Sequence, residues 1–155
     1  MEPNIVTRGA VALAFTTTPT DTLRFLVAGD DESPDITDER LAPGDGPPLH
    51  RHPWMTWEVV IEGRVRAMVG DQTHELGPGD LLFTPPDVPH TFMAVTDARL
   101  VGINWPGGFH HLYAKLAAAF PADGPPDFGA MAAAAAAHGA EILGPPLAVL
   151  ESDAS

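Results

Sequence analysis

Short runs of β-prone residues, separated by Gly, Pro, Asn and Asp, fill the first two thirds of the chain. Runs of this length between turn residues are typical of strands, on which successive side chains point to opposite faces. We predict strands at residues 9–15, 22–28, 36–41, 56–62, 64–69, 72–76, 81–84, 90–95 and 99–105. Many short strands at close spacing predict an all-β fold that is a closed or sandwiched antiparallel sheet.

The hydrophobic period changes from two to about 3.6 after Pro106. Residues 109–120 carry one apolar stripe and end before Pro121, so we predict a helix there. A second, Ala-rich helix is predicted at 128–138, with Asp127 as N-cap and Gly139 as C-cap. We interpret it as a peripheral element and a candidate subunit contact.

We expect one domain. Its first part, residues 1–120, contains the strands and the first helix, and residues 121–155 add a linker, the Ala-rich helix and a tail. Within the tail, residues 141–150 are expected to lay a further apolar segment over the surface, and 151–155 to fray.

Two histidines stand one residue apart in an extended, Pro-rich context: His50 and His52 follow Pro47 and Pro48. On a strand both rings leave the same face, about 6.6 Å apart along the backbone. At that separation they can reach one metal ion. A third ligand must come from elsewhere, and the best candidate is His90, which follows another Pro-rich turn.

The two histidine-bearing stretches resemble the two sequence motifs of the cupin superfamily. The first motif is matched by Gly44, His50, His52 and Gly63, and the second by Gly79, Pro85 and His90. Over residues 40–120 the chain is similar to small single-domain cupins of the quercetin 2,3-dioxygenase-like group. The resemblance implies a cupin jelly-roll β-barrel with the C-terminal α-helices packed on the outside. It also implies one divalent metal ion on His50, His52 and His90.

Three positions depart from the motifs. Thr56 occupies the position of the family's glutamate ligand, Asp87 replaces a glycine, and Ala94 replaces an asparagine. Glu58 lies two residues beyond Thr56 and therefore on the same strand face, displaced by about 6.6 Å. We predict that Glu58 is the catalytic carboxylate, acting through a water or across a β-bulge.

Several apolar residues flank the predicted ligands and are either pocket walls or core. The candidate substrate pocket consists of Trp54, Met55, Thr56 and Phe92. The other histidines receive ordinary structural roles. His74 is expected in an exposed hairpin, His110 and His111 at a helix start, and His138 at a helix C-terminus, where a cation is favoured.

The composition restricts the possible partners. A net charge of −13, from 21 acidic and 8 basic residues, argues against nucleic acid and anionic lipid as partners. The absence of cysteine excludes thiolate ligands, cysteine nucleophiles and disulfides. No stretch approaches the roughly 18 apolar residues of a membrane span. We therefore expect a cytoplasmic protein with a small-molecule substrate. The N-terminal strands and the Ala-rich helix, whose small side chains allow close approach, predict a homodimer.

Three neutral imidazoles leave the full charge of a metal ion uncompensated. That arrangement suits a dioxygenase-like enzyme acting on a small aromatic, phenolic or polyketide-type substrate. It suits equally a zinc-dependent cyclase, isomerase or dehydratase of secondary metabolism. The third alternative is a cupin that binds a small molecule without reaction. Fe, Ni, Zn, Mn, Co and Cu all accept nitrogen ligands, so the sequence leaves the metal open.

Overall fold

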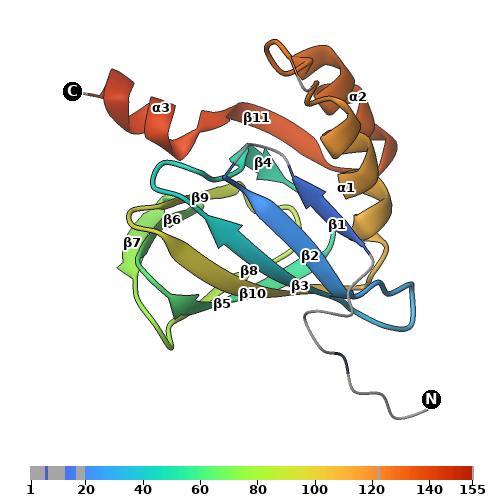
Figure 1. Cartoon of the computed structure of the whole chain (residues 1–155), viewed down its shortest axis with the longest axis horizontal. Coiled ribbons are helices and arrows are strands. Elements are labelled where there is room, and N and C mark those ends of the chain that lie inside the picture. The colour runs from blue at the N-terminus through green and yellow to red at the C-terminus, as the bar shows by residue number, and fades with distance from the viewer. Residues whose placement is uncertain (1–5, 7–12, 17–19, 122, 155) are drawn as a thin grey trace.

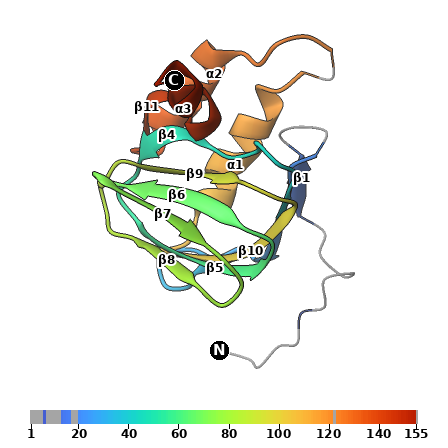
Figure 2. The same cartoon turned by 90° about the vertical axis from the view of Figure 1, so that its left-hand side faces the viewer.

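The chain forms two antiparallel β-sheets packed face to face, with helices at one side (Figures 1 and 2). This computed structural model describes residues 6, 13–16, 20–121 and 123–154. In the described part the larger sheet has the order β1 (Ala14–Thr16), β2 (Thr22–Val27), β3 (Asp35–Leu41), β10 (Ala98–Trp105), β5 (Met55–Glu62) and β8 (Leu81–Thr84). This non-sequential order is that of a jelly-roll sandwich and confirms the predicted fold class.

The smaller sheet carries both predicted histidine segments. Its order is β11 (Glu141–Pro146), β4 (Pro48–Arg51), β9 (His90–Ala94), β6 (Val65–Val69) and β7 (Gln72–Leu76). The predicted strands from residue 22 onward agree with these bounds to within about two residues. The predicted strand at 9–15 falls partly outside the described residues, and β1 covers its last two positions.

The inward side chains change from polar to apolar along the strands. On β5, for example, the inward positions are Thr56, Glu58 and then the fully buried Val60. The apolar ends of both sheets meet in one core made of Leu41, Val60, Val65, Ala67, Phe92, Ala94, Ala98 and Leu100. This core closes one end of the sandwich by burial of apolar surface, and the polar inward positions remain at the other end.

Helices α1 (Phe109–Ala118) and α2 (Phe128–Ala137) follow β10, and α3 (Leu147–Asp153) follows β11. They lie outside the two sheets, as predicted (Figure 1). The described helices include none that is long and apolar enough to cross a membrane.

The Ala-rich helix α2 is better integrated than we predicted. Ala134 and Ala135 are buried and pack with Leu112 of α1, because small side chains let two helices approach closely. Asp127 is the N-cap, as predicted, and accepts a hydrogen bond from the amide of Ala130. The C-cap residue is His138 rather than Gly139, which follows it in the left-handed conformation with φ 74°.

The tail also differs from the prediction. Residues 141–146 form β11, which pairs with β4, so this segment extends a sheet instead of lying over the surface. Residues 151–153, expected to fray, belong to α3. Glu151 on that helix accepts two hydrogen bonds from the guanidinium of Arg66 on β6, at 2.9 and 3.1 Å. This ion pair holds the end of the chain against the smaller sheet.

Asp35 at the start of β3 joins the sandwich to α1. Its fully buried carboxylate accepts hydrogen bonds from the amide of Gly29, at 2.7 Å, and from the amide of His110, at 3.2 Å. It also contacts Nδ1 of His110 at 3.0 Å. Because His110 lies in the first turn of α1, one carboxylate fixes where that helix begins.

Replacing Asp35 should therefore destabilise the fold. Asp35→Ala leaves a buried amide, a part-buried amide and one imidazole without their acceptor, and we expect a loss of about 3 kcal/mol in the free energy of unfolding. Urea denaturation followed by circular dichroism measures the change. Asp31→Ala, at an exposed position of the preceding loop, is the control. Equal denaturation midpoints for the two variants would contradict the role given to Asp35.

Candidate metal centre

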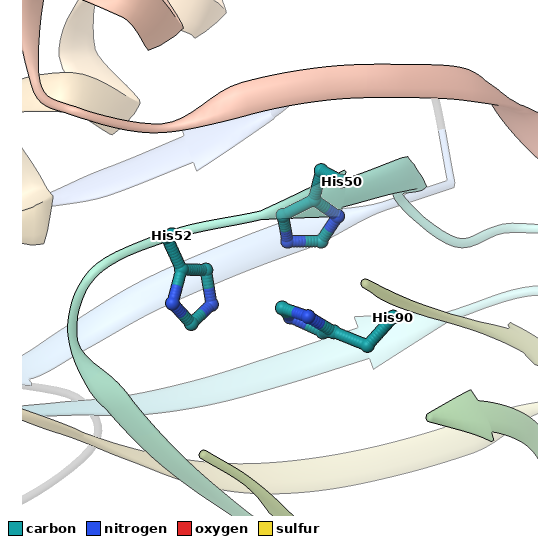
Figure 3. A group of neighbouring side chains, drawn as sticks. All are labelled: His50, His52 and His90. Carbon is teal, nitrogen blue, oxygen red and sulfur yellow. The ribbon is translucent and has the colours of Figure 1, made fainter. Parts of the chain in front are cut away.

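The three predicted ligands meet between β4 and β9. His50 on β4 and His90 on β9 are directly paired across the two strands, and His52 is the first residue after β4. The ring centroids lie 4.2 Å apart for His50 and His90, 4.6 Å for His52 and His90, and 5.5 Å for His50 and His52. One nitrogen of each ring lies within 4.8 Å of the others, and the rings converge (Figure 3). The group could hold a metal ion.

Main-chain carbonyls fix the orientation of all three rings. In each ring Nδ1 lies within hydrogen-bond distance of a carbonyl oxygen two residues away: Pro48 at 2.7 Å from His50, Trp54 at 3.0 Å from His52, and Val88 at 2.8 Å from His90. A carbonyl can only accept, so Nδ1 carries the proton and donates in each ring. The lone pair on Nε2 is therefore free for a metal ion, a common arrangement of metal-binding histidines.

Burial keeps the three imidazoles neutral. It is the main cause that lowers the pKa of His50 to about 4 and the pKa of His52 to about 3, and the neighbouring histidines add to the effect. Burial likewise lowers the pKa of His90. Neutral imidazole is the form that binds metal ions, so the site needs no deprotonation at neutral pH.

The turn of the second motif is bonded to the first motif. The amide of Asp87 donates a hydrogen bond of 2.7 Å to the carbonyl of His52. Asp87 has φ 62°, the left-handed conformation in which Gly is common and Asp is one of the better tolerated alternatives. The replacement of the motif's glycine thus leaves the turn in place. On its other side, the ring of His52 stacks on Trp54 at 4.2 Å.

Thr56 cannot replace the carboxylate that the family motif places there. It is buried, and its hydroxyl donates a hydrogen bond of 2.8 Å to the side-chain oxygen of Asn104 on β10. Glu58 lies on the same face of β5 but outside the three-histidine group. Burial raises the pKa of Glu58 to about 7, so this carboxyl group can gain or lose a proton near neutral pH.

The histidines open into a cavity of about 770 Å³ between the sheets and the helices. Trp54, Thr56, Glu58 and Phe92 line this cavity, together with the three histidines. Met55 does not line it, because adjacent residues of a strand point to opposite faces. Contrary to the prediction, Met55 is therefore not part of the cavity lining.

Sequence reasoning missed two parts of the lining. Polar residues come from the larger sheet, at Thr37, Glu39 and Asn104, and from Asp21 just before β2. Apolar residues come from the C-terminal helices and the loop between them: Phe109, Leu112, Tyr113, Leu116, Phe120, Phe128 and Met131. The signals in the sequence were the polar residues at inward strand positions and the aromatic residues of the predicted helix 109–120.

The remaining histidines stay outside the group, as predicted. His74 on β7 and His111 on α1 are exposed. His110 is bonded to Asp35, and Nδ1 of His138 lies 3.1 Å from the carbonyl of Ala134 in the last turn of α2.

Comparison with known proteins agrees with this geometry. The family model described as "Cupin domain" matches residues 37–105, the segment that carries every predicted ligand. Residues 37–105 form a cupin domain. No curated protein sequence matches the chain.

Solved cupin structures show the same fold at low sequence identity. An RmlC-like cupin from Shewanella frigidimarina is 19% identical, with 69% of this chain and 94% of that chain covered and a TM-score of 0.61. A salicylate 1,2-dioxygenase from Pseudaminobacter salicylatoxidans is 22% identical over 58% of this chain and 27% of that chain, with a TM-score of 0.52. An oxalate decarboxylase variant from Bacillus subtilis is 20% identical over 72% and 33%, with a TM-score of 0.59.

We expect the three histidines of this cupin to act as one site. Alanine at His50, His52 or His90 should each lower the bound metal at least tenfold, because two imidazoles hold a divalent ion far less well than three. Elemental analysis of protein purified without a nickel column gives the metal content. His74→Ala, which removes an exposed histidine, is the matched control. Unchanged stoichiometry in any two of the three site variants would exclude the assignment.

The raised pKa of Glu58 should appear in the stability of the metal-free protein. The folded state keeps a proton on Glu58 up to about pH 7, whereas an unfolded glutamate releases it near its ordinary pKa of 4.5. This group therefore lowers stability as the pH rises between these values, by up to about 1.4 kcal/mol per pH unit.

Urea denaturation of wild type and Glu58→Gln across this range tests the effect. The buried histidines give the opposite slope, because their lowered pKa values make the folded state lose stability as the pH falls. Only the difference between the two proteins isolates Glu58. We expect Glu58→Gln to gain stability relative to wild type as the pH rises, and parallel curves would contradict the raised pKa.

Proposed function

We propose that this cupin is a metal-dependent, dioxygenase-like enzyme acting on a small aromatic, phenolic or polyketide-type substrate. One observation carries the proposal. Three histidines with oriented, neutral rings stand at the wall of a cavity of about 770 Å³ that also contains a carboxyl group with a pKa near 7. A site that binds a cation next to a proton-exchanging group is typical of metal-assisted catalysis.

The donor set fits one divalent ion. His50, His52 and His90 would hold it through Nε2, and the carbonyls that bind their Nδ1 protons would keep the rings in place. Three protein ligands leave coordination positions open, as in catalytic metal sites. Such an ion supplies Lewis-acid activation of a substrate oxygen or, if it is redox-active, activation of dioxygen. Fe, Ni, Zn, Mn, Co and Cu remain candidates.

Glu58 is the residue of the chain best suited to move a proton. Its carboxyl group lines the cavity on β5, opposite the sheet that carries the histidines. With a pKa near 7 it can accept the proton of a phenol or enol at neutral pH and return it later. The three imidazoles are not suited to this, because their Nε2 lone pairs would hold the metal ion and their Nδ1 protons are bonded to main-chain carbonyls.

The apolar part of the cavity favours a flat, largely apolar substrate. Trp54, Phe92, Phe109, Tyr113 and Phe120 contribute aromatic surface to the lining. Aromatic rings stack on such surfaces and gain free energy by leaving water. The salicylate 1,2-dioxygenase shares this fold, which makes a dioxygenase reaction on an aromatic compound the first one to test.

Glu58 also supports the second candidate function, a zinc-dependent cyclase, isomerase or dehydratase. Those reactions need a Lewis acid and a proton shuttle but no redox change at the metal. A binding cupin without catalysis is the third candidate.

A homodimer and a cytoplasmic location remain predictions, as does the assignment to the quercetinase-like group.

Replacing Glu58 separates these possibilities. Glu58→Gln keeps the shape and removes the proton acceptor, so we expect near-wild-type metal content and a turnover that is about 10² to 10⁴ times lower. Oxygen uptake and product formation with flavonols and polyketide-like phenols measure turnover. Glu32→Gln, at an exposed loop position, is the control.

The other outcomes have distinct meanings. Loss of metal in Glu58→Gln would make Glu58 a ligand, reached through a local rearrangement of β5. Full turnover in Glu58→Gln would remove its catalytic role. If the wild-type protein forms product without consuming oxygen, this result would favour the non-redox alternative.

A further inference from the structure

Strand β10 carries one polar side chain on its inward face, that of Asn104. Burial alternates along this strand, and its inward positions are Ala98, Leu100, Gly102 and Asn104. Asn104 is 6% exposed and lines the cavity together with Thr56. A buried amide costs free energy unless its hydrogen-bonding groups have partners. The partners of Asn104 therefore indicate what this position is for.

One half of the Asn104 amide is bonded within the protein. Asn104 lies directly opposite Thr56 on the neighbouring strand β5, and its Oδ1 accepts the hydrogen bond of 2.8 Å from the Thr56 hydroxyl. This bond sets the rotation of the amide group. Because Oδ1 is turned toward Thr56, Nδ2 lies on the other side of the group.

The other half of the amide is available to a molecule in the cavity. Nδ2 carries two N–H donors, and within the described part of the chain no group accepts a hydrogen bond from either. The fully enclosed polar atoms without a partner, among the residues that the structure describes, include none of Asn104. Nδ2 thus keeps accessible surface on a residue that lines the cavity.

Asn104 is also a neighbour of Glu58, the residue proposed to move a proton. Glu58 pairs with Gly102, and Asn104 is two residues further along β10. The two side chains are therefore diagonal neighbours on one face of the sheet, at positions about 7–8 Å apart. One small molecule can contact both, with one oxygen atom at the amide and a proton-exchanging group at the carboxyl.

We propose that Asn104 is a substrate-binding residue whose Nδ2 donates a hydrogen bond to a carbonyl or enolate oxygen, so that the cavity selects aromatic and polyketide-type molecules that carry such an oxygen. An apolar group at the same place would leave two buried N–H donors without an acceptor, which a site built around a hydrogen bond penalises strongly. The inference deepens the proposed function, since it takes the cavity as the substrate site.

Two probes of the same shape test the proposal: 2-acetylnaphthalene, and 2-isopropenylnaphthalene, in which a CH₂ group replaces the carbonyl oxygen. Equilibrium dialysis against zinc-loaded protein gives both dissociation constants, and their ratio is the preference for the ketone. In Asn104→Leu, which removes the donor at similar volume, this preference should fall about fivefold or more. Comparing the same ratio in two proteins cancels the different hydrophobicity of the probes and any contact of the ketone with zinc.

The controls separate loss of the donor from loss of structure. Asn104→Leu leaves the Thr56 hydroxyl without its acceptor, so the double variant Thr56→Val/Asn104→Leu, which removes both partners, is measured as well and should show the same fall. Gln72→Leu removes an exposed amide on β7 and should keep the wild-type preference. Zinc content is measured for every protein. A purely structural role of Asn104 would weaken both probes equally.

A preference that stays unchanged or rises in the Asn104 variants would overturn the proposal, as would an equal fall in Gln72→Leu. Failure of the proposed function gives a different pattern, because the dialysis measures binding and not turnover. If the preference falls as expected but no substrate turns over, the binding role of Asn104 stands while the enzymatic role is lost. If turnover is found and the preference does not fall, only the role of Asn104 is lost.

Discussion

The pairing of β4 with β9 is the constraint on which the site depends. It places His50 directly opposite His90, although the two motifs lie far apart in the chain. A shift of this register by one residue would turn one of the two rings to the other face of the sheet, away from the cavity. The pairing is held from both sides, because β11 extends the sheet beyond β4 and β6 extends it beyond β9. The late segment 141–146 is therefore part of the support of the metal centre.

Local pattern was sufficient to predict most strands and the three histidines of the candidate metal site. Period-two runs between Gly and Pro residues gave the strand bounds, and the two motifs gave His50, His52 and His90. The carbonyls that orient the rings are also local, each two residues from its histidine. What the sequence could not show is which inward positions face the histidines, since that depends on how two sheets pack. Glu39 was missed for this reason, and so were the helix residues that complete the lining.

The departures from the family motif have different physical consequences. Asp87 keeps the left-handed backbone of the glycine it replaces, so that change is absorbed locally. Thr56 is different, because a hydroxyl bonded to Asn104 cannot stand in for a carboxylate. The nearest carboxyl group on the same strand is that of Glu58, which lies outside the three-histidine group. The chain thus has no carboxylate at position 56 and has a carboxyl group with a pKa of about 7 further along the same strand.

As a result of these changes, the two sheets would have different roles at the site: the smaller sheet would bind the metal ion and the larger sheet would exchange protons. With three neutral ligands, a bound divalent ion would keep its full charge, and the smaller sheet would polarise whatever oxygen atom lay against it. The larger sheet opposes it with acids that hold protons because burial raises the pKa of Glu39 and of Glu58, with the charges of neighbouring acids adding to the effect at Glu39. A positive centre on one wall and proton-exchanging carboxyl groups on the other would act on the same bound molecule from opposite sides. That separation allows Glu58 to exchange protons without binding the ion, which a glutamate at position 56 could not do.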